Sequence, residues 1–298
     1  GERPLGEATD LDLVLIDGDP PARRREVLPL SDGLVADLHI HAREDYRNPK
    51  ALRVDPWRGP EMCEPIFLYD PQHFFELAQA SARGQFHRPD HVVARAQAFL
   101  QLARRHLQVN AFGVDSTPQA PVSIEGLCLG LMCAANAVIT LTGFPGAGRR
   151  LLLRLESAAA RLGRPTLYDG FLAALAPNGV PAQSARAWVT EWTTTYQAAQ
   201  SDDDPLLHPA RLPIYLRGFT AQIEADRAPD LVWLMLFTWQ SALRRIPAAT
   251  AGALGYVDLL DHLGMADAVG LQKRVAAAIA YGRQCQIEVE TWAQRNGA

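Results

Sequence analysis

Three aspartates near the start of the chain have the residue type and spacing of metal ligands. Asp10 and Asp12 are separated by one residue, and Asp37 lies in an otherwise apolar run. Carboxylates held side by side repel each other unless a cation lies between them, and Mg²⁺ typically binds one or two carboxylates together with water and phosphate oxygens. A buried charge at Asp37 is costly unless it is paired or bound to a metal. The three residues are therefore candidate ligands of Mg²⁺ or Mn²⁺.

A purely structural interpretation of the same residues stays open. Asp10 can cap a turn, while Asp12 and Asp37 can be surface residues of half-exposed strands. Two aspartates that are one residue apart are common in proteins. The metal hypothesis therefore depends on the third aspartate and on the glycine-containing segment, residues 1–8, that precedes the pair.

Two histidines after Asp37 indicate a second kind of metal chemistry. Side chains alternate along a strand, so Asp37, His39 and His41 share one face, and imidazole binds transition metals well. The pattern resembles the HxH opening of metal-dependent phosphoesterases and amidohydrolases, whose fold needs further ligands at the ends of later strands. The remaining histidines lie outside any expected strand. Alternatively, His39 is a general base, since its unperturbed pKa of ~6.5 suits proton transfer, or a solvated strand-end residue.

Short apolar segments are expected to position these residues as β-strands. Leu11–Ile16 and Leu34–Ile40 are apolar runs bounded by polar or turn-forming residues, and Pro65–Tyr69 is a third candidate. In the first strand, alternation places Asp10 and Asp12 on one face and directs the leucines that alternate with them toward the core. We expect the three aspartates to lie close together at adjacent strand ends.

After these segments the sequence pattern becomes helical. From Asp70 onward, apolar residues recur with a period near 3.6, and Asp70 and Pro71 are expected to be the N-cap and first residue of a helix. The expected helices cover residues 71–82, 89–108, 119–141, 147–163, 181–200, 208–226, 229–245, 249–263 and 267–295. The chain is therefore predicted to be an α+β protein, with a small α/β module in residues 1–70 and a large all-α domain in residues 71–298.

Composition and charge predict a soluble protein and do not favour a nucleic-acid partner. Of the 298 residues, 48% are hydrophobic and 21% are charged, and the formal net charge is −4. Because a nucleic-acid-binding protein is expected to carry a basic face, nucleic acid is not favoured.

The four cysteines lack CxxC spacing, which predicts free, mostly buried thiols in a cytoplasmic protein. The apolar residues 122–144 include Glu125 and Asn136 and are expected to form a buried helix rather than a membrane span.

The N-terminal residues resemble a known enzyme superfamily. Gly1–Asp12, with the sequence GERPLGEATDLD, is similar to the signature of the DNA-polymerase-β-like nucleotidyltransferases. That signature is a Gly-Ser pair, then Gly-Glu/Asp-Ala, then Ser/Thr-Asp-x-Asp. Phe67–Asp70, FLYD, resembles the LYD strand end of the same family. The resemblance covers about the first seventy residues, and the remainder is similar in general character to the helical domains of antibiotic-modifying members.

The resemblance implies a metal-dependent nucleotidyltransferase. In the family, the first two carboxylates bind the metals that hold the triphosphate, and a third on the next strand binds metal or acts as a base. By position these are Asp10, Asp12 and Asp37, while Gly1 and Arg3 fall in the nucleotide-binding part of the signature. The implied cofactor is Mg²⁺ or Mn²⁺, and the implied substrate is an NTP, with ATP expected. The NMP would move to an acceptor hydroxyl, with a small molecule favoured and no membrane partner.

The chain departs from the family signature at two points. Glu2 replaces the usual serine, and an acidic side chain facing phosphates is unfavourable. The sequence also starts at the first glycine of the signature, so the strand and helix that precede the signature in the family are expected to be missing. These departures support an alternative, a catalytically degenerate protein of the same fold that binds a nucleotide or a partner. The HxH hydrolase is the third hypothesis.

Overall fold

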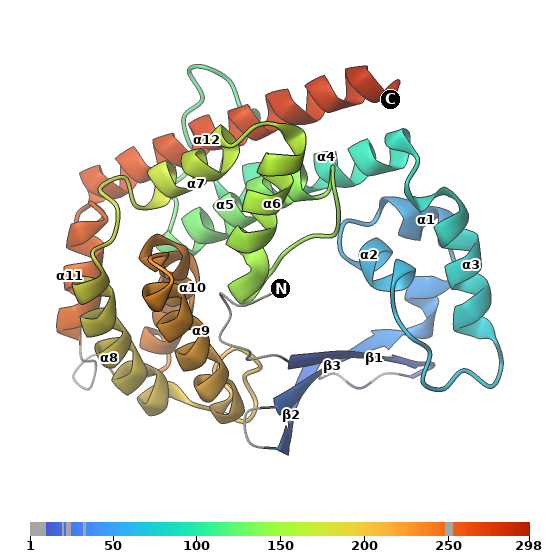
Figure 1. Cartoon of the computed structure of the whole chain (residues 1–298), viewed down its shortest axis with the longest axis horizontal. Coiled ribbons are helices and arrows are strands. Elements are labelled where there is room, and N and C mark those ends of the chain that lie inside the picture. Colours follow the sequence, from blue (N-terminus) through green and yellow to red (C-terminus); the bar gives the residue numbers. More distant parts are fainter. Residues whose placement is uncertain (1–9, 20, 22–24, 32–33, 248–252) are drawn as a thin grey trace. The chain divides into compact units, whose positions relative to one another are not determined.

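The computed structural model describes residues 10–19, 21, 25–31, 34–247 and 253–298. In these ranges the chain is mostly helical and contains a small sheet, which is compatible with the expected α+β class (Figure 1). The sheet has three strands, β1 (Asp10–Asp17), β2 (Arg25–Ser31) and β3 (Leu34–Ala42), in the order β1-β3-β2.

The helical elements follow the strands without a further strand in the described residues. The 3₁₀ turns are η2 (Arg43–Tyr46), η3 (Gly148–Arg150) and η4 (Pro209–Arg211), and the α-helices are α1 (Pro49–Val54), α2 (Arg58–Cys63), α3 (Phe74–Phe86), α4 (Pro89–His106), α5 (Ile124–Ile139), α6 (Leu151–Leu162), α7 (Thr166–Leu175), α8 (Ala182–Ala199), α9 (Leu212–Glu224), α10 (Ala228–Leu243), α11 (Ala253–His262) and α12 (Ala268–Asn296). Every expected helical segment overlaps one of these helices. The additional helices are α1, α2 and α7, of which α1 and α2 have six residues each, too few for a helical period to show.

The described residues fall into two compact units. Unit 1 takes them from Gly1–His41, Ser123–Cys128 and Leu172–Val275, and unit 2 from Ala42–Val122, Leu129–Phe171 and Ala276–Ala298. This division does not follow the boundary expected at residue 70. The sheet belongs with helices that come much later in the sequence, because Val27 and Val35 pack against Ile214 of α9, with Ala210 of η4 beside them.

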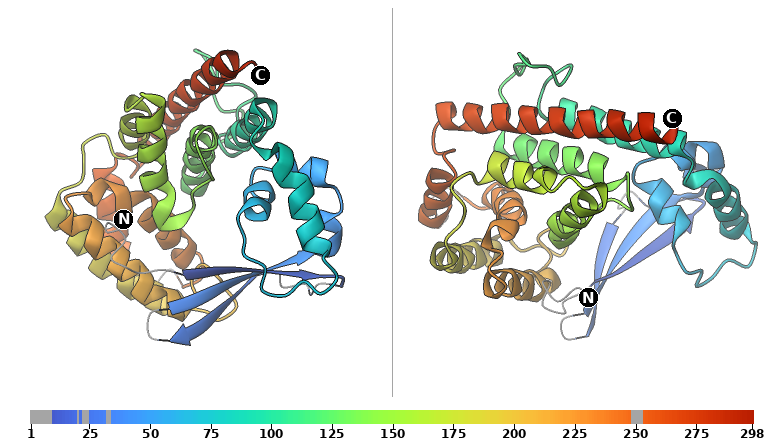
Figure 2. Two further views of the ribbon diagram at one scale, coloured as in Figure 1. Left: turned by 45° about the vertical axis from the view of Figure 1, so that its right-hand side comes forward. Right: turned by 45° about the horizontal axis from the view of Figure 1, so that its top comes forward.

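In unit 1, the helices α8, α9 and α10 pack against one another (Figures 1 and 2). Trp188, Trp192 and Tyr196 recur on one face of α8 and are fully buried, so they form core. Their polar atoms are satisfied: the indole N–H of Trp188 donates to Asp258, and that of Trp192 donates to Thr238. Packing therefore accounts for this aromatic stripe.

In unit 2, the short helices α1 and α2 pack against α3. Close approach between α1 and α2 depends on Gly59, because a Cβ atom there would lie 2.4 Å from the carbonyl oxygen of Leu52 and 3.1 Å from a ring carbon of Phe86. Asp70 caps the start of α3, as its carboxylate accepts the backbone N–H of Phe74 at 3.1 Å. The Asp70 side chain thus caps the helix, but the expected N-cap position is wrong, because His73 is the N-cap residue and α3 begins at Phe74 rather than at Pro71.

One of the expected strands does not form. Pro65–Tyr69 is not a strand but a loop, and Ile66, Leu68 and Tyr69 are more than four-fifths exposed. An apolar run becomes a strand only when a neighbouring strand pairs with it, and this one instead leads into the Asp70 cap. The sheet obtains its third strand from β2, which contains Pro29. Proline is tolerated there because β2 is an edge strand.

The leucines of β1 also lie elsewhere than expected. Leu11 and Leu15 are 46% and 47% exposed instead of buried in the core. By alternation they lie on the face opposite to Asp10 and Asp12. The pattern of β1 thus predicts that its aspartates share a face but not that its leucines are exposed, and β1 is an edge strand of the sheet.

The helices and cysteines agree with two further expectations. In the described part of the chain, no helix has the length and apolar character needed to cross a membrane. The apolar segment expected to be a buried helix corresponds to α5, where most side chains are buried. All four cysteines are free and buried.

Two matched glycine substitutions test the packing of α1 and α2. Gly59→Ala should lower the free energy of unfolding by about 1–3 kcal/mol, because the added methyl group meets a backbone oxygen that cannot move independently. Gly84 is exposed on α3, and a Cβ atom there meets no atom within 4 Å. Gly84→Ala should therefore raise the free energy of unfolding by about 0.5–1 kcal/mol. Unfolding by urea measures the change in the free energy of unfolding of both variants. Equal effects, or a stabilising effect at Gly59, would contradict the close approach.

Candidate functional site

The sheet brings a potential metal-binding set together in unit 1. Asp12 on β1 and Asp37 and His39 on β3 each offer a ligand atom, and these atoms lie within 4.8 Å of one another. β1 is the direct neighbour of β3 in the sheet, and Asp37 and His39 are two residues apart and so share a face. Asp12 is exposed, His39 is partly exposed and Asp37 is buried, so the set opens toward solvent.

Asp37 is the centre of an ionic hydrogen-bond network. Arg25 binds both of its oxygens, with Nε 2.8 Å from Oδ1 and Nη2 2.6 Å from Oδ2. Arg211 donates from Nη2 to Oδ2 of Asp37 and from Nη1 to Oδ2 of Asp10, the latter at 3.2 Å. His39 Nε2 lies 3.6 Å from Asp37 Oδ1. We call Asp10, Asp37, Arg25 and Arg211 the arginine–aspartate cluster.

Strand register places Arg25 beside Asp37. β2 and β3 are antiparallel, with Arg25 opposite His39 and Val27 opposite Asp37. Arg25 and Asp37 are therefore diagonal neighbours on one face of the sheet, a separation that a long side chain spans. The contact follows directly from the pairing of the two strands.

Arg211 reaches the sheet from a turn that is fixed by the helical core. His208 precedes η4, and its Nδ1 accepts the backbone N–H of Ala210 at 3.2 Å. The hydroxyl of Tyr196 on α8 donates to the carbonyl oxygen of His208 at 2.9 Å. Arg211 itself is buried. The aromatic stripe of α8 thus holds the turn that delivers the guanidinium group to Asp37.

The network controls the protonation of Asp37. Burial raises the pKa of this carboxyl group, but the hydrogen bonds from Arg25, the neighbouring His39 imidazole and the charges of Arg211 and Arg25 lower it by more. The pKa of Asp37 therefore lies well below its usual range. A carboxylate with so low a pKa is a poor proton acceptor near neutral pH, so Asp37 suits ligand or ion-pair roles rather than general base catalysis.

Of the remaining residues that the sequence predicts for the site, Asp10 joins the cluster and the others lie outside the described residues. Asp10 is linked to Asp37 through Arg211. Gly1 and Arg3, expected to contact the nucleotide, lie outside the described residues, as does Glu2. The HxH interpretation requires ligands on later strands, and the described residues after Ala42 contain only helices, turns and loops.

Sequence reasoning missed the two arginines of the cluster. Arg25 belongs to a strand that the sequence pattern did not predict. Arg211 lies 174 residues after Asp37, and no local pattern marks it as a partner of the sheet. The one available signal was indirect: a carboxylate expected to be buried in a strand requires a positively charged partner.

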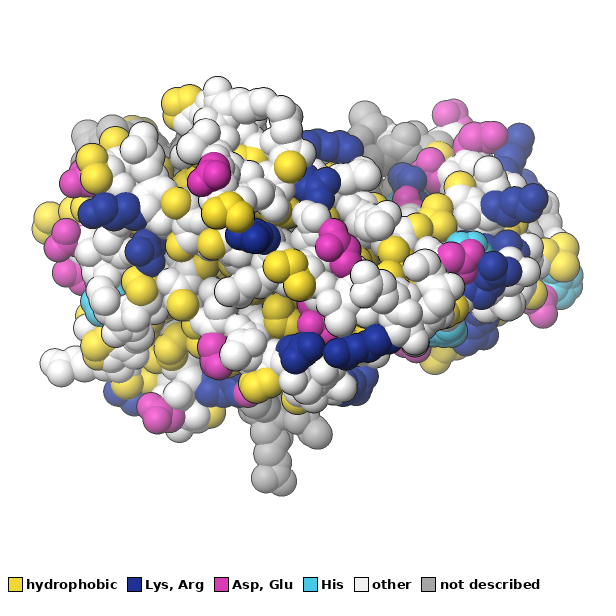
Figure 3. All heavy atoms as spheres, turned by 90° about the horizontal axis from the view of Figure 1, so that it is seen from above, with side chains coloured by type: hydrophobic (Ala, Val, Ile, Leu, Met, Phe, Trp, Pro, Cys, Tyr) yellow, Lys and Arg dark blue, Asp and Glu magenta, His cyan; other side chains and the backbone are white. Residues whose placement is uncertain are grey.

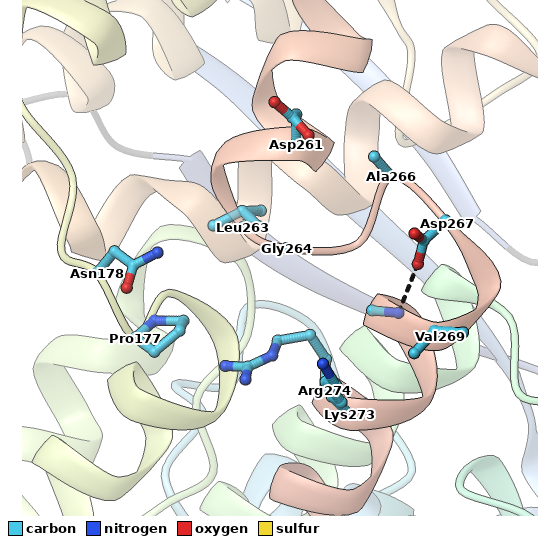
Figure 4. Close-up of a pocket in the computed structure, with 11 residues that line it drawn as sticks. Pro177, Asn178, Asp261, Leu263, Gly264, Ala266, Asp267, Val269, Lys273 and Arg274 are labelled. Atoms are coloured by element: carbon cyan, nitrogen blue, oxygen red, sulfur yellow. Dashed lines mark hydrogen bonds between the residues drawn. The ribbon is translucent and has the colours of Figure 1, made fainter.

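A surface hollow of about 450 Å³ lies elsewhere in unit 1 (Figure 4). It lies between the loop after α7 and the segment that joins α11 to α12. Its lining includes both acidic side chains, Asp261 and Asp267, and basic ones, Lys273 and Arg274, and Asp267 accepts the backbone N–H of Gly270 at 2.7 Å. None of the candidate site residues lines this hollow.

Comparison with known proteins gave no match to a family model, to a curated protein or to a solved structure. The chemistry of the site is therefore inferred from its own residues. Those residues combine an oxygen- and nitrogen-donor set with two fixed guanidinium groups.

Replacing Asp37 by Asn tests the cluster. The free energy of unfolding should fall by about 3–5 kcal/mol at neutral pH, because Arg211 then stays buried without its main counter-charge. Since the folded pKa of Asp37 is lowered, its stabilisation is complete above the unfolded pKa of ~3.9 and is lost as the pH falls below it. Between pH 6 and about 3, urea unfolding should therefore show a steeper loss in the wild type than in Asp37→Asn.

Asp90→Asn is the matched control. Arg88 also binds Asp90 through two hydrogen bonds, each 3.0 Å long, but this pair is exposed. Exposed ion pairs contribute little to stability, so this variant should unfold much like the wild type. Equal destabilisation in the two variants would show that the cluster is no more than a surface ion pair.

Proposed function

We propose that the chain is a metal-dependent nucleotidyltransferase that moves an NMP from an NTP, with ATP expected, to a hydroxyl group of a small molecule. The observation that carries this proposal is the convergence of Asp12, Asp37 and His39, with ligand atoms within 4.8 Å of one another. The resemblance of the N-terminal sequence to nucleotidyltransferases supports the same conclusion.

The donor set fits a divalent cation. Carboxylate oxygens suit Mg²⁺ and Mn²⁺, and the imidazole of His39 favours the transition metal Mn²⁺ over Mg²⁺. A divalent ion, when bound, would neutralise phosphate charge and lower the pKa of an acceptor hydroxyl. His39 Nε2 lies 3.6 Å from Oδ1 of Asp37, so the two side chains can offer ligand atoms to the same ion.

The side chains of the site would orient the triphosphate and provide positive charge to its phosphate oxygens. Asp37 holds Arg25 in place through two hydrogen bonds, and the side chain of Arg25 is 45% exposed. A fixed, partly exposed guanidinium group binds phosphate oxygens well, since its donors match their geometry. Arg25 is therefore proposed to bind the triphosphate beside the metal-binding set.

The charge of the protein bears on whether the acceptor is a small molecule or RNA. The net charge is −4, and on the face shown in Figure 3 acidic and basic side chains are interspersed. Binding of a polynucleotide typically uses Lys and Arg gathered along one face. A small-molecule acceptor is therefore favoured over RNA.

One observation favours the degenerate alternative. Two arginines already bind Asp37, so its charge is balanced without any metal ion. A protein that had lost catalysis could retain this cluster as a structural element and bind only a nucleotide or a partner.

Asp12→Asn separates the two functions. Pyrophosphate release from NTPs, measured with Mg²⁺ or Mn²⁺ across pooled hydroxyl acceptors, should fall by at least about 100-fold in this variant, because it removes a charged ligand from the site. The matched control is Asp17→Asn on the same strand, where the side chain only accepts the N–H of Asp19 at 3.0 Å. That variant should keep full activity.

Each outcome assigns a function. A wild-type protein that binds NTP without releasing pyrophosphate under any of these conditions is the degenerate protein. Full activity in Asp12→Asn at saturating metal would show that the metal-binding set has been placed wrongly. Loss in Asp12→Asn alone supports the proposed enzyme.

A further inference from the structure

We propose that the guanidinium group of Arg211 is a built-in cation that occupies the position between Asp10 and Asp37, so that the site binds a single divalent metal ion. The inference rests on the proposed function, because both require a metal ion beside Asp12. In place of the metals that the resemblance implies, the site would hold one metal ion and one arginine.

Arg211 bridges two of the carboxylates that the sequence pattern predicts as metal ligands. Its two terminal nitrogens bind two different carboxylates, Nη1 to Asp10 and Nη2 to Asp37. A cation between two carboxylates is the arrangement that the sequence pattern predicts for a metal. Here a side chain of the protein provides that positive charge.

The arginine cannot leave this position easily. Arg211 is 6% exposed, and a guanidinium group stays charged at any relevant pH. A buried charge needs counter-charges, and Asp10 and Asp37 provide them. The turn that carries Arg211 is itself held by Tyr196 through the carbonyl oxygen of His208.

The hydrogen-bonding capacity of Asp37 leaves room for one further partner. An ionised carboxylate offers about four lone-pair sites, two on each oxygen. Oδ2 accepts from both Arg25 and Arg211, and Oδ1 accepts from Arg25. The remaining site is on Oδ1, the oxygen that faces His39 at 3.6 Å.

The remaining site coincides with the metal-binding set. Asp12, Asp37 and His39 are the residues whose ligand atoms converge, and Asp10 is not one of them. Asp10 and Asp37 therefore hold Arg211, Asp37 also holds Arg25, and Asp12, Asp37 and His39 are left to hold one metal ion.

Counting bound Mn²⁺ tests the inference without measuring activity. Titration of the intact chain, followed by isothermal calorimetry and by the electron paramagnetic resonance signal of free Mn²⁺, should give one ion per chain in the wild type and in Arg211→Lys, which keeps the charge. Arg211→Gln, which removes it, should bind a second ion. Arg244→Gln removes an arginine from an ion pair with Glu125 elsewhere in unit 1 and should still bind one.

The outcomes are distinguishable. Two ions in the wild type would overturn the role of Arg211 and leave the proposed function standing. No ion in the wild type would overturn the metal site, and with it both proposals. If Arg211→Gln does not fold, the wild-type count still decides between one ion and two, and Asp12→Asn should reduce that count from one to none.

Discussion

A single buried charge, that of Asp37, constrains the organisation of unit 1. The carboxylate lies inside the central strand of the sheet, where burial without a partner would be costly. It is stabilised by an arginine from the neighbouring strand and by another from η4, 174 residues later. The sheet is thereby tied to a helical core made from the second half of the chain. This ionic contact and the small apolar cluster around Ile214 explain why the strands do not form a module with the residues that immediately follow them.

The same contacts determine what chemistry the site can perform. Because the arginines lower the pKa of Asp37, this residue stays ionised and is available as a ligand but not as a base. In the proposed function, the guanidinium groups that lie beside the carboxylates would bind phosphate oxygens. The rigid attachment of Arg211, through η4 and Tyr196, means that this charge has a defined place before any substrate arrives.

The sequence predicts local features well and long-range contacts poorly. The helices are recognisable because a period of 3.6 persists over many residues, and Asp37 and His39 are recognisable because alternation along one strand is a local property. β2 escapes prediction since Pro29 interrupts its pattern, and Pro65–Tyr69 is misassigned because an apolar run alone does not reveal whether a strand will pair with it. Arg211 illustrates the limit: its partnership with Asp37 depends on how α8, η4 and the sheet pack, and nothing near residue 211 encodes that.

Stability alone does not account for every residue of the site. Asp37 already has its partners in Arg25 and Arg211, so a purely structural cluster would be complete without Asp12 or His39. The partly exposed imidazole of His39 lies 3.6 Å from Asp37, a separation longer than a strong hydrogen bond. Ligand atoms that converge from two strands, with one side chain exposed and another partly exposed, form the arrangement that a ligand-binding site requires. The position of Asp12 and His39 therefore favours a metal-dependent function over a cluster that only stabilises the fold.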